Sequence, residues 1–219
     1  MIGIRHEKPA DYRLVEEITR EAFWNLYCPG CNEHLIVHGL RDHEDFIPEL
    51  TFVVELDGKV VGSIFYSRSK VVAPDGKETA TITFGPVGIL PELQRRGIGK
   101  ALIAHSIEAA RKLGHRAIII GGDPQHYRIY GFSGAKKYGI SMPDGRYYTG
   151  IMALPLHEGA LDGIHGKVFF SEAFEPDEQI LEDFDGTFPP KEKGVQESQA
   201  EFVRASAEID TKDYAQTSE

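Results

Sequence analysis

The chain is poor in cysteine and in long apolar runs. Its 219 residues include two cysteines, too few for a disulfide framework, so the fold depends on a buried core and the expected compartment is a reducing cytoplasm. The length suits one domain with an appendage, and such a chain can bury a sizeable core. No apolar run approaches the roughly 20 residues of a membrane helix, and the N-terminus turns polar almost at once. We therefore expect neither a membrane partner nor a targeting segment.

Basic charge is also scarce, since the formal net charge is −10. Residues 157–219 hold 16 Asp and Glu against 5 Lys and Arg, whereas residues 1–156 hold 18 acidic and 19 basic residues. A near-neutral domain with an acidic tail lacks the basic footprint of nucleic-acid binding, so we expect no nucleic-acid partner. We interpret the tail as a solvated segment, with attraction of cationic partners as the alternative.

Residues 81–112 read as a strand, a loop and a helix. An apolar run over residues 82–90 ends at Pro91, and a short turn follows it. From residue 98 onward, apolar side chains recur at about 3.6-residue spacing, which predicts a helix with one apolar face against a sheet. The rest of the chain is interpreted around this unit.

The loop between that strand and that helix suits an anion. Gly97 and Gly99 lack Cβ atoms, so a ligand can approach the backbone, and the first N–H groups of the helix point outward. Arg95, Arg96 and Lys100 add positive charge to the positive end of the helix dipole. This combination predicts a pyrophosphate site, although a glycine pair at a helix start can also be only a tight turn.

Two patterns together identify a family. Gln94-x-x-Gly97-x-Gly99 follows an apolar strand and opens an Ala- and Leu-rich helix. The segment from Tyr127 to Phe132 follows a second apolar strand, residues 117–120. In this order the patterns resemble those of the GCN5-related N-acetyltransferases (GNAT). The resemblance covers about residues 1–156, which implies a GNAT domain over residues 1–156 and an acidic extension over residues 157–219, partly ordered and then flexible.

The predicted fold class is α/β (α+β), a mixed sheet of six to seven strands with helices on both faces. The Asp57-Gly58 dipeptide predicts a hairpin, so the first half of the sheet should be antiparallel. The helical crossover over residues 97–113 requires a parallel pair between residues 81–90 and 116–121, the only parallel pair that we expect. Gly85-Pro86 interrupts the first of these strands, so this central pair should splay there.

The resemblance implies acetyl-CoA as the co-substrate and no metal. In a GNAT fold the splayed strand frees backbone groups near Gly88 for the pantetheine arm, while the glycine loop holds the pyrophosphate. One family contact is not carried over, because Ile120 stands where many relatives have a cofactor-binding Asn. The implied cofactor-binding residues are Val87, Gly88, Ile89, Arg95, Arg96, Gly97, Ile98, Gly99 and Lys100.

Tyr127 matches the residue that protonates the leaving thiolate in the family, and a phenol is a reasonable acid for a group of thiol pKa. The alternative for Tyr127 is an amphipathic side chain in the wall of the cleft. Tyr130 lies close in the sequence and is interpreted as packing beside Phe132. We therefore predict Tyr127 as the catalytic residue.

The general base is missing from the expected place, because the strand before the loop offers Phe84, Gly85 and Pro86 and no carboxylate. In GNAT folds the segment between the first two helices walls the acceptor site, so a base or pocket residue could come from there. Glu49 is more often only a strand-entry residue. The candidates for the acceptor pocket are Trp24, Glu33, His34, His38 and Glu49.

Cys28, Cys31, His34 and His38 suggest a metal site at first sight, since the two histidines lie one helical turn apart. Their spacing argues against zinc, because a C-x-x-C pair followed so soon by H-x-x-x-H lacks the roughly 12-residue arm that lets two ligand pairs meet. We predict pocket-lining residues or an exposed helix face instead.

Three functions from different classes remain open at this level. The first is an N-acetyltransferase that acts on a primary amine of a small molecule or a protein. The second is a non-catalytic acyl-CoA-binding or sensor module, which the missing base keeps open. The third is a nucleotide-phosphate site in another α/β protein, which the antiparallel hairpins before the loop oppose.

Past residue 156 the patterns weaken. Residues 167–174 predict one more strand, which packs on the domain or on a second copy of the chain in a homodimer. Residues 188–194 read as a linker because they contain two prolines and three charges. Residues 195–219 are polar, which predicts disorder or one marginal helix.

Overall fold

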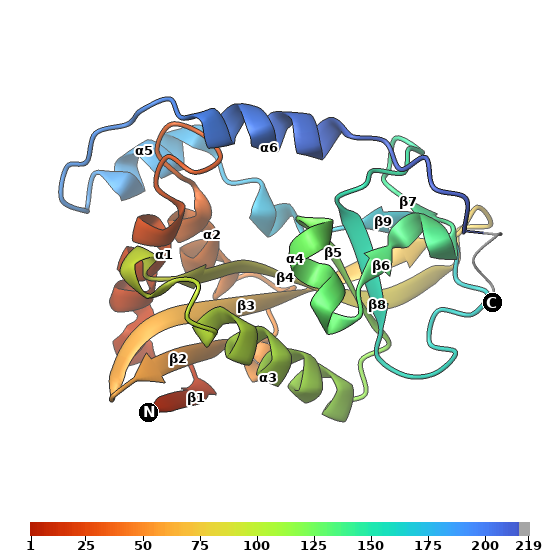
Figure 1. Cartoon of the computed structure of the whole chain (residues 1–219), viewed down its shortest axis with the longest axis horizontal. Coiled ribbons are helices and arrows are strands. Elements are labelled where there is room, and N and C mark those ends of the chain that lie inside the picture. Colours follow the sequence, from red (N-terminus) through yellow and green to blue (C-terminus); the bar gives the residue numbers. More distant parts are fainter. Residues whose placement is uncertain (215–219) are drawn as a thin grey trace. The chain divides into compact units, whose positions relative to one another are not determined.

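The structure is a computed structural model that describes residues 1–214, arranged in two compact units. The first unit comprises residues 1–67, 84–110 and 171–200, and the second comprises residues 68–83, 111–170 and those after 200. Strands β3 (Lys59–Val72) and β4 (Glu78–Ile89) continue from one unit into the other, as do helices α3 (Ile98–Lys112) and α6 (Glu197–Ala207). Figure 1 labels these elements.

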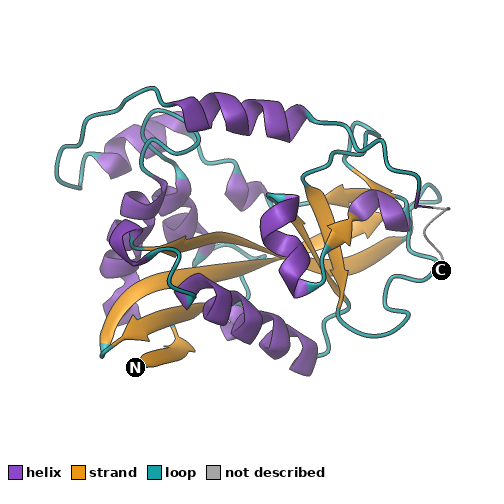
Figure 2. Ribbon diagram, in the orientation of Figure 1, coloured by secondary structure: helices purple, strands orange, loops and turns teal. Residues whose placement is uncertain are grey.

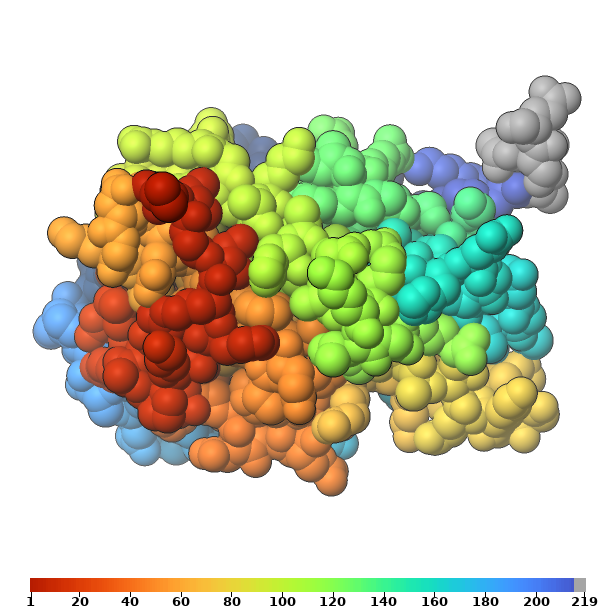
Figure 3. Space-filling model, turned by 90° about the horizontal axis from the view of Figure 1, so that it is seen from below, coloured from red at the N-terminus to blue at the C-terminus, as the bar shows by residue number. Residues whose placement is uncertain are grey.

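The first unit carries the antiparallel half of the sheet. Strand β1 (Ile2–His6) pairs with β2 (Phe52–Leu56), and β2 pairs with β3, both antiparallel. Asp57 and Gly58 both have positive φ, 51° and 79°, as a tight hairpin turn with right-handed twist requires. The predicted hairpin is therefore confirmed. The N-terminal chain lies on the surface of this unit, and its first residue accepts a backbone hydrogen bond from Asp57 (Figure 3).

Helices cover both faces of this half-sheet (Figure 2). Successive apolar side chains of its strands point to opposite faces, so both faces are apolar. Val53 and Phe65 point to one face and pack with apolar side chains of α1 (Tyr12–Phe23) and α2 (Glu33–Leu40). Phe52 and Tyr66, the strand neighbours of Val53 and Phe65, meet α3 on the other face. The Phe52 ring lies 4.9 Å from that of His105, and the Tyr66 hydroxyl is 2.9 Å from Ser106 Oγ.

The second unit carries the parallel pair that the crossover predicted. Strand β4 runs parallel to β5 (Ala117–Gly121), with Ile82 opposite Ile118, upstream of Gly85-Pro86. Strand β5 pairs antiparallel with β8 (Ile151–Pro155), and β8 pairs with the short β6 (Ser133–Gly134). Among the described residues the sheet has nine strands, more than the six to seven predicted, and seven of them form the path β1-β2-β3-β4-β5-β8-β6.

Two further strands correct the prediction of a single parallel pair. Strand β9 (Gly166–Phe169) pairs antiparallel with the end of β3, and β7 (Ile140–Ser141) pairs parallel with β9. With only two residues, β7 shows no periodicity that a sequence could reveal. The core beneath these strands is small and aliphatic; it consists of Val71, Ala117, Ile119, Ala135, Ile140, Ala153, Leu161 and Val168.

The C-terminal segment continues past β9 through the 3-10 helix η6 (Glu172–Phe174), α5 (Glu178–Asp185) and α6. Residues 171–200 belong to the first unit, where the irregular stretch of residues 187–194 hydrogen-bonds to α1 and the loop after it. The division of domains at residue 156 stays a prediction. A helix forms over part of the polar tail, and its last five residues lie outside the described residues. No helix within residues 1–214 is long and apolar enough to cross a membrane.

Candidate functional site

The glycine loop is a compact turn held to the end of β4. After η3 (Pro91–Leu93), Arg95 and Gly97 both adopt positive φ, 58° and 82°. The Gln94 side chain reaches back and donates from Nε2 to the Ile89 carbonyl oxygen at 3.0 Å. The Leu90 N–H in turn donates to the Val61 carbonyl oxygen of β3 at 2.9 Å. The loop is thus tied to the end of β4 by its own Gln94 side chain, and the end of β4 is tied to β3 by the Leu90 N–H group.

The helix that follows begins with free donors. Its first hydrogen bond runs from the Ala101 N–H to the Gly97 carbonyl oxygen at 3.0 Å. The N–H groups of Ile98, Gly99 and Lys100 precede that bond and have no intrahelical acceptor. Ile98 is buried and anchors the turn in the core, while Lys100 is exposed. The start of α3 therefore presents donors and the positive end of a helix dipole to the surface.

Space around the two glycines is open. A Cβ built on Gly97 would meet no atom within 4 Å, and one on Gly99 would meet only Ile89 Cγ1, at 3.5 Å. Arg95 and Arg96 are exposed beside them. Uncovered backbone, outward N–H groups and cations make this a site for an anion such as a phosphate group.

Just before the loop, strand β4 packs closely against both α1 and β3 at Gly88. Gly88 lies against α1, since a Cβ there would come 3.3 Å from Ala22 Cβ and 3.4 Å from the Phe23 ring. On β3, a Cβ at Gly62 would lie 2.5 Å from the Gly88 carbonyl oxygen, so only glycine fits opposite Gly88. Gly62 was not singled out in the sequence, although a lone glycine within a strand pattern does suggest such an approach.

Tyr127, in the second unit, ends helix α4 (Pro124–Tyr127), which Asp123 caps by accepting the Gln125 N–H at 2.8 Å. The half-buried Tyr127 ring stands 5.8 Å from the Phe132 ring. It also occupies the space over Gly122, where a Cβ would come 3.0 Å from Tyr127 Cδ2. Gly122 is thus a residue that sequence reasoning missed and that fixes where the Tyr127 ring can lie.

Tyr130 differs from the simple packing residue that the sequence suggested. Its ring lies 6.3 Å from that of Tyr127, and burial raises the pKa of its phenol. Within the described part of the chain, the buried Tyr130 hydroxyl has no hydrogen-bond partner. Tyr130 therefore holds its proton firmly and carries an uncompensated polar group.

The predicted acceptor residues lie in the first unit, and the C-terminal segment covers two of them. Trp24 donates from Nε1 to the Glu192 carbonyl oxygen at 2.8 Å, and the Arg20 guanidinium lies 4.2 Å from the centre of its ring. His34 is wholly buried, and its Nε2 lies 3.1 Å from Asp185 Oδ1. Burial lowers the pKa of His34 to about 4. His34 is a neutral core side chain with no surface left for an acceptor.

The other three candidates differ in exposure. Glu33 opens α2 and accepts the Asn32 N–H at 3.1 Å; burial raises its pKa to about 7. Among the described residues, no cation pairs with the Glu33 carboxylate. The side chain of His38 is half exposed, and its Nδ1 lies 2.9 Å from Glu16 Oε1. Glu49 is exposed in η2 (Pro48–Leu50), at the entry to β2.

The two cysteines are free thiols. Cys28 is exposed and Cys31 is buried, and burial raises the pKa of both, so both are weak nucleophiles. No group of three or more metal-ligating side chains gathers within residues 1–214.

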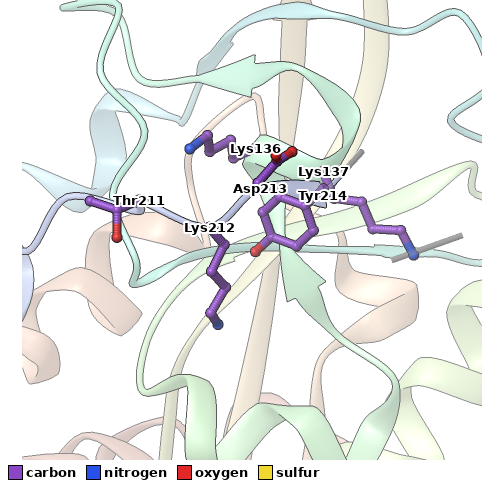
Figure 4. Close-up of a pocket in the computed structure, with 6 residues that line it drawn as sticks. All are labelled: Lys136, Lys137, Thr211, Lys212, Asp213 and Tyr214. Atoms are coloured by element: carbon purple, nitrogen blue, oxygen red, sulfur yellow. The ribbon is translucent and has the colours of Figure 1, made fainter. Parts of the chain in front are cut away.

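A pocket of about 520 Å³ lies in the second unit, and none of the predicted site residues lines it (Figure 4). Six residues line it, three of them lysines. One of these, Lys136, donates to the Asp210 carbonyl oxygen at 2.8 Å. The lining residues are Lys136, Lys137, Thr211, Lys212, Asp213 and Tyr214.

Comparison with known proteins gives consistent matches. The N-acetyltransferase YhbS of Escherichia coli K12 is 23% identical over 171 residues, which cover 78% of this chain and 97% of YhbS. The crystal structure of YhbS in complex with CoA has the same fold, with a TM-score of 0.70 over 80% of this chain and 92% of that one. A GNAT family acetyltransferase of Brucella melitensis, crystallised with acetyl-CoA, is 28% identical, with a TM-score of 0.64 over 80% of this chain and 98% of that one.

The family itself is matched directly. A sequence model of the Acetyltransferase (GNAT) family matches residues 19–132, more than half of the chain. These residues include the strand, the glycine loop and the helix that the two sequence patterns singled out, as well as Tyr127. The chain therefore belongs to the GNAT family of acetyltransferases.

Proposed function

We propose that this acetyltransferase transfers the acetyl group of acetyl-CoA to a primary amine of a small molecule or a protein, by direct attack in a ternary complex. The observation that carries the proposal is the start of α3, where open glycine backbone, outward N–H groups and exposed cations meet. Family membership supports it, as do the relatives that were crystallised with CoA and with acetyl-CoA.

In this proposal the pyrophosphate of acetyl-CoA binds at residues 95–100. The N–H groups of Ile98, Gly99 and Lys100 donate to its oxygens, and the exposed arginines balance its charge. The pantetheine amides pair with backbone groups of Val87 to Ile89, as an added strand would. The N–H groups near Gly88 also stabilise the oxyanion that forms at the thioester carbonyl.

The chemical step needs one acid and one base. The neutral amine attacks the thioester carbon, the C–N bond forms and the C–S bond breaks, and the thiolate leaves with a proton from the Tyr127 phenol. The amine gives up its own proton to a base, for which we propose Glu33. Its carboxylate has a pKa of about 7 because of burial, which suits proton transfer at neutral pH.

The test is thiol release from acetyl-CoA with a panel of primary amines, together with calorimetric binding of acetyl-CoA. We expect release that depends on the amine, an acetylated product by mass spectrometry and binding of acetyl-CoA without the amine. Binding of acetyl-CoA with no amine-dependent release across the panel would replace the transferase with the acyl-CoA-binding module.

Two further expectations belong to the same proposal. The first is a cytoplasmic location, which the two free cysteines favour, and the second is a homodimer. Sedimentation velocity over a range of concentrations measures the oligomeric state directly. A single monomer species at every concentration would remove the homodimer from the proposal.

A further inference from the structure

The loop that joins α1 to α2 is tied to the C-terminal segment by one of its own residues, Asn25. Asn25 follows the end of α1 with φ of 59°, a conformation that side chains other than glycine seldom adopt. Its Oδ1 accepts the N–H groups of Gly30 at 2.8 Å and of Gly194 at 3.0 Å. Its Nδ2 donates to the Glu192 carbonyl oxygen at 3.2 Å. One carboxamide thus joins two segments that lie about 170 residues apart in the sequence.

Gln199 completes this connection from the first turn of α6. Its Nε2 donates to the Asn25 carbonyl oxygen at 3.0 Å and to the Gly194 carbonyl oxygen at 2.9 Å. Both amide side chains are about nine-tenths buried, with 9% of Asn25 and 8% of Gln199 exposed. Buried amides with this many partners fix the backbone around them, because moving it would strand polar groups. We call Asn25 and Gln199 the amide clasp.

Contacts on either side of the amide clasp also join the same two segments. Trp24 Nε1 and Asn25 Nδ2 share the Glu192 carbonyl oxygen, and Ser198 Oγ donates to the Leu26 carbonyl oxygen at 2.9 Å. The Lys193 side chain lies over Gly30, where a Cβ would come 3.2 Å from Lys193 Cε. Figure 1 shows the start of α6 beside the loop that follows α1. Residues 24–32 therefore have their shape set by residues 192–199.

The helix end that leads into this loop contacts the part of β4 at which acetyl transfer is proposed. Ala22 and Phe23, the last residues of α1 before the loop, lie against Gly88. On the same strand, a Cβ at Gly85 would come 3.8 Å from Phe174, at the start of the C-terminal segment. In the proposed reaction, an amine that approaches a thioester at Gly88 must pass the side chains that border this part of β4, such as Phe23 and Phe174. The cofactor loop of residues 94–100 makes its own contacts with Ile89 and does not use the clasp.

We propose that Asn25 and Gln199 are positioning residues for the acetyl acceptor: the amide clasp holds residues 24–32 in the shape that selects the amine. This inference rests on the proposed function. Without the clasp, a loop with positive φ at Asn25 and Gly30 would sample many conformations, and binding of the amine would have to order it each time. Acetyl-CoA would meet the same glycine loop as before.

The test compares matched variants in the full chain. Asn25→Gly allows the left-handed backbone conformation without strain and removes all three side-chain hydrogen bonds. Asn25→Asp keeps the acceptor oxygen and loses only the donor. Gln199→Ala removes the other half of the clasp, and Gln196→Ala, an exposed position one turn away, is its control. Each variant is measured for the KM of the amine, kcat, the Kd of acetyl-CoA and its melting temperature.

We expect Asn25→Gly and Gln199→Ala to raise the KM of the amine about tenfold or more, with kcat and the Kd of acetyl-CoA within about twofold of the parent. Asn25→Asp should recover part of the affinity, and Gln196→Ala should match the parent. An unchanged KM in either folded clasp variant would overturn the inference, and so would equal losses in amine and acetyl-CoA binding. If Asn25→Gly does not fold, Gln199→Ala decides alone. A parent without amine-dependent release would instead overturn the proposed function and this inference with it.

Discussion

At the scale of single residues, the proton donor is the sharpest assignment. Tyr127→Phe keeps the ring, its place over Gly122 and its contact with Phe132, and removes the hydroxyl group with its proton. If that proton goes to the thiolate, kcat should fall by roughly 10² or more, while the Kd of acetyl-CoA stays near the parent value. Thiol release and calorimetry measure the two quantities separately.

Tyr130→Phe is the control for Tyr127→Phe. It removes a buried hydroxyl that has no hydrogen-bond partner within residues 1–214, so the melting temperature should stay the same or rise, and kcat should not change. Equal rates for Tyr127→Phe and the parent would remove Tyr127 from the mechanism. A loss confined to Tyr130→Phe would move the proton donor to Tyr130.

Glu33 allows a second test at the residue scale, through pH. Its folded pKa of about 7 lies above the ordinary value of 4.5, so its contribution to stability is fully present below pH 4.5 and is lost as pH rises through 7. The Glu33→Gln side chain does not titrate, so its contribution to stability does not fall with rising pH. Relative to the parent, the variant should gain in free energy of unfolding between pH 5 and pH 8, at about 1.4 kcal/mol per pKa unit at most.

The same Glu33→Gln variant tests the base. In the parent, kcat/KM should rise with pH through an apparent pKa of about 7, and in the variant this limb should be missing with a lower plateau. Glu49→Gln, at an exposed glutamate, should keep the parent profile. An unchanged profile in Glu33→Gln would assign the base to water or to another group.

At the scale of elements, the start of α3 carries the cofactor prediction. Gly97→Ala adds a methyl group to open backbone at the proposed pyrophosphate site. Because residue 97 has a φ of 82°, any side chain there also strains the backbone. Gly145 has the same φ of 82° and equally open surroundings in an exposed turn, so Gly145→Ala measures the strain alone. Both variants should lose about 1 kcal/mol of stability, and only Gly97→Ala should weaken acetyl-CoA binding, by about tenfold or more. Equal acetyl-CoA affinity in both would move the pyrophosphate elsewhere.

The elements also show which parts of the fold can be predicted from the sequence. The Asp57-Gly58 hairpin and the strand, loop and helix of residues 81–112 were predictable because their signals are local: turn chemistry, period and a glycine pattern. Strand β7, of two residues, carries no period, and its parallel pairing with β9 comes from tertiary packing. The same limit applies to Gly62 and Gly122, whose need for glycine arises from neighbours that touch them in space, the Gly88 backbone and the Tyr127 ring.

For the whole molecule, the main departure from the prediction is that part of the acidic tail packs against α1 and α2 in the first unit. Composition indicated a solvated segment, and charge alone cannot reveal that Asp185 reaches Arg20 at 2.7 Å or that Phe184 stacks on His34. The one-turn spacing of His34 and His38 predicted pocket-lining residues or an exposed helix face, whereas His34 is wholly buried. The side chains that bury His34 come from about 150 residues further on, beyond any local pattern.

That burial makes the stability of the whole molecule sensitive to acid. The His34 ring packs against the Phe184 and Phe188 rings. The ionisable groups around it are Arg20, Asp185, Glu16 and Cys31. Its folded pKa of about 4 is below the ordinary 6.5, so the folded state binds fewer protons than the unfolded state between these values. The stability from a neutral His34 is therefore complete above pH 6.5 and is lost as pH falls towards 4. The lowered pKa of Asp185 acts in the same direction.

The expected result is a urea midpoint that drops for the parent between pH 6.5 and pH 4.5, and that drops less for His34→Gln, which stays uncharged at both values. At pH 7 the variant should be the less stable protein, because the amide fits the aromatic pocket less well than the imidazole ring. His38→Gln is the control, since the side chain of His38 is half exposed. Parallel pH curves for the parent and His34→Gln would show that protonation of His34 does not drive acid unfolding.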